Sequence, residues 1–285
     1  MTIKDDKKLI KTLGTQATGL FLGLYERGRR TFTLLEASEI TGLKNQSLRN
    51  FIHKLVKSGA ITRLSSGLYN IVPLELGYAK EYLGNPYLVA REIAQKKFKE
   101  KKAQYYISHN SAMEIYQMVT QPQFVVHVTV TQQIRDHEIL GTKFHFVTCK
   151  PRHYFGFVKH WVDKSEMVWV SDLEKTILDC LKMPQYCGGI TEIAKGLWIK
   201  RKELDVSKLV DYAQKLDVGV VCQRLGYLLE VYKIMCAKEI LRLQRKMTKT
   251  YLLLDPTLPS EGKYDARWRL RLNVSKEELL SILRT

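Results

Sequence analysis

Acidic residues are scarce in this chain of 285 residues, which has 29 aspartates and glutamates against 46 lysines and arginines. The net charge of +17 predicts a polyanionic partner, with nucleic acid as the leading candidate and an anionic membrane surface as the weaker one. No apolar run reaches the about 18 residues of a membrane span, and the opening MTIKDDKKLIK lacks the apolar stretch of a signal peptide. We therefore expect a cytoplasmic protein without a membrane partner.

Cysteine is also sparse, because the chain has five cysteines, an odd number, and no C-x-x-C pair. This usage indicates reduced thiols in a cytosol rather than a disulfide framework. Apolar residues make up 45% of the chain, which is enough for a real core and excludes a disordered protein. The length exceeds that of one average domain, so the sequence predicts two.

The order of elements over residues 1–73 is the most informative pattern in the sequence. A first helix ends at Gly28, and an extended piece at Phe32 follows it. A short helix then opens with the capping box Thr33–Glu36 and ends in a Thr41-Gly42-Leu43 turn. A second helix over 46–58, with Asn45 as N-cap, precedes a hairpin over 61–72. This is the order of a winged helix-turn-helix, whose second helix enters the major groove of DNA while the hairpin touches the backbone.

Polar side chains cover the predicted outer face of the second helix and the hairpin. Asn, Gln and Arg read base edges, whereas Lys and Ser serve phosphates. The predicted DNA-binding residues are Lys44, Asn45, Gln46, Ser47, Arg49, Asn50, His53, Lys54, Lys57, Arg63, Ser65 and Ser66. Two alternatives stay open: a merely solvated helix face, and a winged helix that binds a protein.

The remainder of the chain predicts a linker over 74–85, with a short helix around 77–83, and a second domain over 86–285. Strands come first and helices afterwards, which indicates an α+β fold. The expected strands are 104–107, 124–131, 143–148, 155–161, 167–170 and 267–274. The expected helices are 87–102, 112–118, 172–183, 190–200, 206–216, 219–232, 236–246 and a last one from Ser275.

Asp172, Glu174 and Lys175 are the best candidates for catalysis, since paired acids beside a lysine can hold Mg²⁺ and steer a water molecule. They make a metal-dependent nuclease the alternative function. A capping box from Ser171 to Glu174, with an apolar stripe behind it, accounts for the same residues. We therefore predict no catalytic residue and no enzyme activity.

Metal and cofactor motifs are missing as well. Five histidines cluster near Cys149, but their spacing matches no zinc pattern; they are His127, His137, His145, His153 and His160. Cys180 and Cys187 are expected to be packing residues. No phosphate-binding glycine loop or nucleophile motif occurs, so we predict neither a metal nor a cofactor.

The RWRLRL segment at 267–272 alternates strictly between basic and apolar residues. In a strand, its apolar side chains would face inward, and the opposite face would carry arginines about 7 Å apart: Arg267, Arg269 and Arg271. Such a row predicts a possible second basic face for a DNA backbone or an acidic partner, and a solvated face is the equal alternative.

Taken together, these segments resemble the AbiEi family, the antitoxins of type IV abortive-infection toxin–antitoxin systems. The resemblance lies in residues 33–73, in YYISHNSAMEIYQM at 105–118, in VSDLEKTILDCLKMPQYCGGITEIAKGL at 170–197 and in RWRLRLNV at 267–274. Their order and spacing carry it, because no single piece is a diagnostic motif.

The resemblance implies a bacterial autorepressor that binds inverted repeats upstream of its own operon through an N-terminal winged helix. It also implies a C-terminal antitoxin domain over 86–285 that counters a nucleotidyltransferase-like toxin without forming a stable complex. No short motif assigns the antitoxin function to residues. Two-fold operators lead us to expect monomers that bind double-stranded DNA cooperatively, or a weak dimer on DNA.

Overall fold

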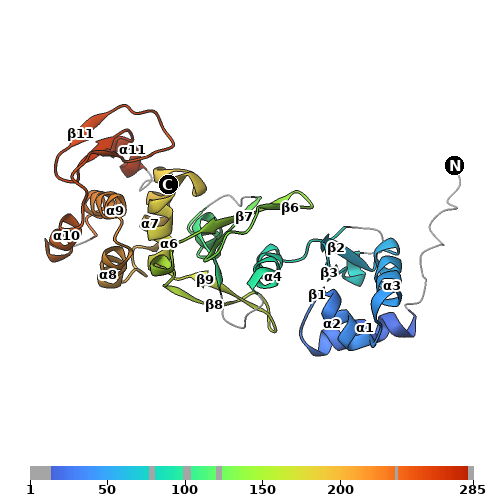
Figure 1. Ribbon diagram of the computed structural model, residues 1–285. Coiled ribbons are helices and arrows are strands. Elements are labelled where there is room, and N and C mark those ends of the chain that lie inside the picture. Colours follow the sequence, from blue (N-terminus) through green and yellow to red (C-terminus); the bar gives the residue numbers. More distant parts are fainter. Residues whose placement is uncertain (1–13, 77–80, 99–103, 120–123, 235–236, 282–285) are drawn as a thin grey trace, which may run out of the picture. The chain divides into compact units, whose positions relative to one another are not determined.

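The computed structural model describes residues 14–76, 81–98, 104–119, 124–234 and 237–281 (Figure 1). Over these residues the chain is a mixed α/β protein with eleven α-helices and three β-sheets. None of the helices described is long and apolar enough to cross a membrane.

The described residues divide into two compact units. The first lies within Met1–Lys99, His137–Lys143 and Trp161–Val168, and the second within Glu100–Asp136, Phe144–His160 and Trp169–Thr285. The boundaries expected at residues 73 and 86 stay predictions. The first unit extends past both of them and includes the helix that follows the linker.

The first unit begins with three helices and a small sheet. The elements are α1 (Thr15–Glu26), β1 (Thr31–Thr33), α2 (Leu34–Thr41), α3 (Asn45–Lys57), β2 (Ile61–Ser65) and β3 (Leu68–Ile71), followed by the 3-10 turn η1 (Leu74–Leu76). The strands pair antiparallel in the order β1-β3-β2. Apolar side chains of all three helices pack on this sheet around Leu20, Phe32 and Ile52, as the helical spacing of the sequence predicts.

The starts of α2 and α3 differ in how they are capped. The capping box of α2 is confirmed, because Thr33 Oγ1 accepts from the Glu36 backbone N–H while Glu36 Oε2 accepts from the Thr33 N–H at 2.7 Å. The N-cap expected at Asn45 is wrong. Lys44 occupies the cap position, and Asn45 is the first helical residue with φ of 50°, a conformation that asparagine tolerates better than most residues.

Helix α4 (Pro86–Phe98) starts where the Asn-Pro pair predicts. Asn85 Oδ1 accepts from the Tyr87 backbone N–H at 2.9 Å, and proline suits the first helical turn because it has no N–H to satisfy. Parts of the predicted helices lie outside the described residues: the chain before residue 14, 77–80 of the linker helix, 99–102 of this helix, and residue 236. The described remainder of the linker helix, 81–83, is not helical, so that prediction is wrong there.

A six-stranded sheet has the order β6-β7-β5-β4-β9-β8. Its strands are β4 (Tyr105–Ile107), β5 (Val125–Val130), β6 (His137–Ile139), β7 (Thr142–Thr148), β8 (Phe157–Trp161) and β9 (Met167–Ser171), with α5 (His109–Ile115) after β4 and η2 (Pro151–His153) after β7. Strand β4 pairs antiparallel with β5 and parallel with β9. The sequence predicts each of these strands except β6.

Helices dominate the later part of the chain. They are α6 (Leu173–Lys182), α7 (Ile190–Lys200), α8 (Val206–Leu216), α9 (Gly219–Val231), α10 (Ala237–Gln244) and α11 (Lys276–Ser281), with the turn η3 (Pro184–Tyr186) and the strands β10 (Leu252–Leu253), β11 (Lys263–Asp265) and β12 (Leu270–Leu272). Their apolar faces form one core around α6 and α9. Cys180 and Cys187 lie in it as free thiols, which confirms that they are packing residues.

The strand predicted over 267–274 is wrong in its first half. Residues 266–269 form a turn in which Arg269 has φ of 48°, and only Leu270–Leu272 pair as β12. Trp268 explains the turn, since its ring lies fully buried where a Cβ on Gly226 of α9 would come within 2.0 Å of it. Burying this large ring determines the backbone there more than the alternating pattern does.

The start of α6 also differs from expectation. Asp172, not Ser171, is the N-cap, and its Oδ1 accepts from the Lys175 backbone N–H at 2.9 Å. Ser171 ends β9, and its hydroxyl lies 2.7 Å from the Thr176 hydroxyl. Both residues are short and polar, so the sequence pattern alone could not separate the strand end from the cap.

Replacing Asp172 with alanine should lower the free energy of unfolding by about 1–2 kcal/mol, because the first turn of α6 loses its cap. Asp172→Asn, which keeps an acceptor oxygen, should cost less. Urea unfolding of the two variants measures the difference. Equal losses for both would show that the carboxylate charge rather than the cap matters.

Candidate nucleic-acid interface

The polar face of α3 is fully presented to solvent. Leu48, Ile52 and Leu55 face the core of the first unit. Every residue predicted from this helix to contact DNA is exposed: Lys44, Asn45, Gln46, Ser47, Arg49, Asn50, His53, Lys54 and Lys57. One amphipathic helix therefore separates a packing stripe from a continuous polar surface.

This surface has few internal partners. Gln46 Nε2 donates to Asn50 Oδ1 at 2.9 Å, so the two amides lie in line along the helix. Among the described residues, no carboxylate lies within ion-pair distance of Lys44, Arg49 or Lys54. Uncompensated cations beside aligned amides suit a partner that offers anionic oxygens and base edges.

The β2–β3 hairpin carries the other predicted contacts. Arg63 and Ser66 are exposed, and Ser65 is half-buried. The tip turns at Gly67, which has φ of 73°. The ammonium of Lys96, near the end of α4, donates to the Ser66 carbonyl. The predicted set omits Lys96. The only signal for it in the sequence is its place in the helix predicted over 87–102, which contains five lysines. The contact with the hairpin joins residues 30 positions apart, so the sequence does not reveal it.

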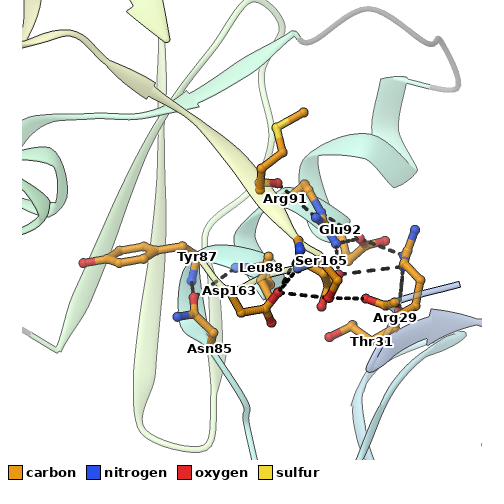
Figure 2. Close-up of polar contacts among 12 residues, drawn as sticks. Arg29, Thr31, Asn85, Tyr87, Leu88, Arg91, Glu92, Asp163 and Ser165 are labelled. Carbon is orange, nitrogen blue, oxygen red and sulfur yellow. Dashed lines mark hydrogen bonds and ion pairs between the residues drawn. The ribbon is translucent and has the colours of Figure 1, made fainter. Parts of the chain in front are cut away.

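Arg29, which precedes β1, binds three carboxylates, and Figure 2 shows it beside one of them, Glu92. Its guanidinium lies 3.4 Å from Glu36 of the α2 capping box, 2.9 Å from Glu92 of α4, and 3.9 Å from Glu166. Two of its nitrogens also donate to the Thr31 carbonyl. The start of α2 and the middle of α4 are thus joined through one side chain.

Arg91 completes this network. It bridges Glu92 and Glu166, with Nη2 at 2.9 and 2.6 Å from their carboxylate oxygens, and donates to the Met167 carbonyl at 3.0 Å. Beside it, the Ser165 hydroxyl donates to the Gly28 carbonyl at 3.1 Å (Figure 2). A Cβ on Gly28 would come within 2.7 Å of Ser165, so this approach needs glycine.

The three arginines of the 267–272 segment do not form a row. Arg267 pairs with Glu230 at 2.6 Å, Arg269 donates to the Thr248 carbonyl at 3.0 Å, and Arg271 donates to the Ser260 hydroxyl at 2.9 Å. The turn at 266–269 breaks the alternation, and each arginine has a partner on a different segment. The strand row expected for these arginines is therefore wrong, and a second basic face stays a prediction.

The candidate nuclease residues each have a structural partner within the second unit. Lys208 lies 3.2 Å from Asp172 and 2.7 Å from Glu174. Lys175 is fully buried, is paired with Asp179, and lies 3.1 Å from the Tyr106 hydroxyl. Within the described residues, no three His, Cys, Asp or Glu side chains are arranged to hold a metal ion.

Two of the five clustered histidines lie in an aromatic group that also contains His109. His127 and His145 have ring centroids 5.7 Å apart, and Tyr186 lies 5.3 and 4.8 Å from them. His145 Nδ1 is 2.7 Å from Asp136, whereas His127 Nδ1 is buried without a hydrogen-bond partner. Burial lowers the pKa of His109 to about 4 and that of His127 to about 3, so both rings are neutral at pH 7.

Comparison with solved structures shows the fold. The crystal structure of the RV2827C protein from Mycobacterium tuberculosis is similar over 96% of both chains, with a TM-score of 0.69 and 13% sequence identity. No family model and no curated protein matches the chain. At this low identity the likeness concerns the architecture alone.

Proposed function

We propose that this chain is a sequence-specific DNA-binding transcriptional repressor of its own promoter, with residues 14–72 acting as a winged helix-turn-helix. The polar face of α3 carries the proposal, because it is exposed, cationic and without carboxylate partners among the described residues. The preceding short helix α2 and the following hairpin are the elements that accompany a recognition helix in this class.

The side chains divide by chemistry into two groups. Arg49, Asn50 and Gln46 carry the paired donors and acceptors that read base edges in the major groove. Lys54 and Lys57 lie toward the end of α3 and suit phosphates, as do Arg63 and Ser66 of the hairpin, which acts as the wing. Base reading therefore concentrates in the first half of α3, and positioning in the rest of the surface.

The decisive experiment compares binding to the DNA just upstream of the gene with binding to scrambled DNA of equal length, over a salt series. Arg49→Ala and Asn50→Ala should each reduce the preference for the upstream DNA by about 5- to 150-fold, which corresponds to about 1–3 kcal/mol. Lys54→Ala should weaken binding to both DNAs equally and reduce the salt slope by about 1.

The two kinds of variant control for each other, since they remove neighbouring exposed side chains from one helix. Unchanged preference in every α3 variant would exclude α3 as the reading element. A different result is that the unaltered chain binds both DNAs equally and loses this binding as salt rises. That result would favour non-specific electrostatic binding to polyanions, or a winged helix that binds a protein.

The antitoxin role is part of the same proposal and is supported by the family resemblance of the sequence. A cytoplasmic repressor would then also counter a nucleotidyltransferase-like toxin through residues after 86. Co-expression with the product of a neighbouring gene of that kind tests it: restored growth with the full chain supports the role, and continued toxicity contradicts it.

A further inference from the structure

Two side chains of helix α4 contact the elements that precede it in the first unit. Glu92 binds Arg29 at 2.9 Å, and Lys96 donates its ammonium to the carbonyl of Ser66 at the hairpin tip. These two residues are four apart, so they lie on the same face of the helix, one turn from each other. The first anchor is buried, with Glu92 only 5% exposed, and the second is at the surface.

The end of α4 is cationic and exposed beside the hairpin. Lys96 and Lys97 are both exposed, and among the described residues neither has a carboxylate within ion-pair distance. An ammonium has three donors, so Lys96 can hold the Ser66 carbonyl and still bind an anion. Cations also suit the C-terminal end of a helix dipole, but that effect does not require contact with the hairpin.

The partner is identified by charge and by continuity with the wing. Double-stranded DNA carries one negative charge per about 1.7 Å of its axis. When the wing touches one phosphate, side chains beside the wing therefore have other phosphates within reach. We propose that α4 is a second DNA-backbone contact beside the wing, with Lys96 and Lys97 binding phosphates. The inference rests on the proposed function and extends its surface beyond the helix-turn-helix.

The test is the salt dependence of DNA binding by Lys96→Ala/Lys97→Ala. The slope of log K against log salt is negative, and each lost phosphate contact reduces its magnitude by about 0.9. The double variant should therefore have a slope that is shallower by about 2. Its affinity near physiological salt should fall roughly tenfold or more. Preference for upstream over scrambled DNA should stay unchanged, because backbone contacts carry no sequence information.

Two further variants sharpen the result. Lys96→Arg/Lys97→Arg keeps both charges and should restore the slope. Lys238→Ala/Lys276→Ala removes two exposed lysines of α10 and α11, so it controls for the loss of net charge and should leave the slope unchanged. An equal fall in the slope for the control pair would mean that only total charge matters, which would overturn the inference.

The outcomes separate the inference from the function on which it rests. If the alanine pair keeps the slope of the unaltered chain while Arg49→Ala still loses preference, α4 is not a contact and the repressor proposal stands. If the unaltered chain shows no preference but the alanine pair lowers the slope, α4 contacts DNA and the proposed sequence reading fails. If the chain does not bind DNA at all, both fail.

Discussion

Replacing Lys175 with methionine is expected to lower the free energy of unfolding by about 3–5 kcal/mol, because it leaves the Asp179 carboxylate unpaired in the protein interior. Lys175 is fully buried on α6 and paired with Asp179 one turn later. Its ammonium also lies 5.4 and 5.3 Å from the ring centroids of Tyr106 and Phe155. Methionine fills similar volume, so the loss would come from the charge rather than from a cavity.

Lys175→Met/Asp179→Asn is the matched control. Asparagine keeps an acceptor for the Tyr106 hydroxyl, which donates to Asp179 Oδ2 at 3.0 Å. Burial, together with the Asp179 carboxylate, raises the pKa of Tyr106 well above its ordinary value, so this hydroxyl keeps its proton. The double variant should recover most of the loss in urea unfolding, because neither partner is then a buried lone charge. A loss below about 1 kcal/mol in the single variant would contradict a tightly buried pair.

This pair also bears on the nuclease alternative. A lysine that assists Mg²⁺ chemistry would have to lie beside Asp172 and Glu174, whose carboxylates bind Lys208 instead. The three residues lie within four positions of the sequence, but Lys175 points to Asp179 and the Tyr106 ring. Their closeness in one helix predicts a shared site, but the side chains point to different partners and do not form that site.

The elements that local sequence dictates were predicted well. Helices α7 and α8 begin and end where their apolar periodicity indicates, and the Thr33–Glu36 capping box forms as expected. Each depends on residues within one or two turns. Two helix starts were misplaced by one residue, since Lys44 and Asp172 are the N-caps of α3 and α6. The larger failure came where a distant group decides the backbone, as at Arg269, whose turn accommodates the ring of Trp268 against α9.

The candidate interface shows the same division. Exposure of the α3 polar face follows from amphipathic spacing and could be read from the sequence. The contacts around that face could not, since Arg29 meets Glu92, and Lys96 meets Ser66, across 63 and 30 sequence positions. A charged residue in a sequence does not reveal which of many opposite charges it meets. The role proposed for α4 thus needed the structure.

Acidification is expected to destabilise the protein between about pH 6.5 and pH 4 through two buried histidines. Burial lowers the pKa of His109 to about 4 and that of His127 to about 3, and the positive charge of neighbouring histidines lowers the pKa of His127 further. The unfolded chain therefore binds protons first as the pH falls. Stability is complete above about pH 6.5 and is lost below it, by on the order of 3 kcal/mol for each histidine near pH 4.

His127→Gln isolates this effect from the other acid-sensitive groups. Glutamine does not titrate, so the variant should lose stability less steeply than the unaltered chain when urea unfolding is measured from pH 7.5 to 4.5. The difference in slope should approach one proton, or about 1.4 kcal/mol per pH unit. His53→Gln, which removes an exposed imidazole of α3, is the matched control. Parallel curves for His127→Gln and the unaltered chain would show that His127 takes up its proton over the same pH range in the folded and unfolded chain, which would contradict the lowered pKa of the buried ring.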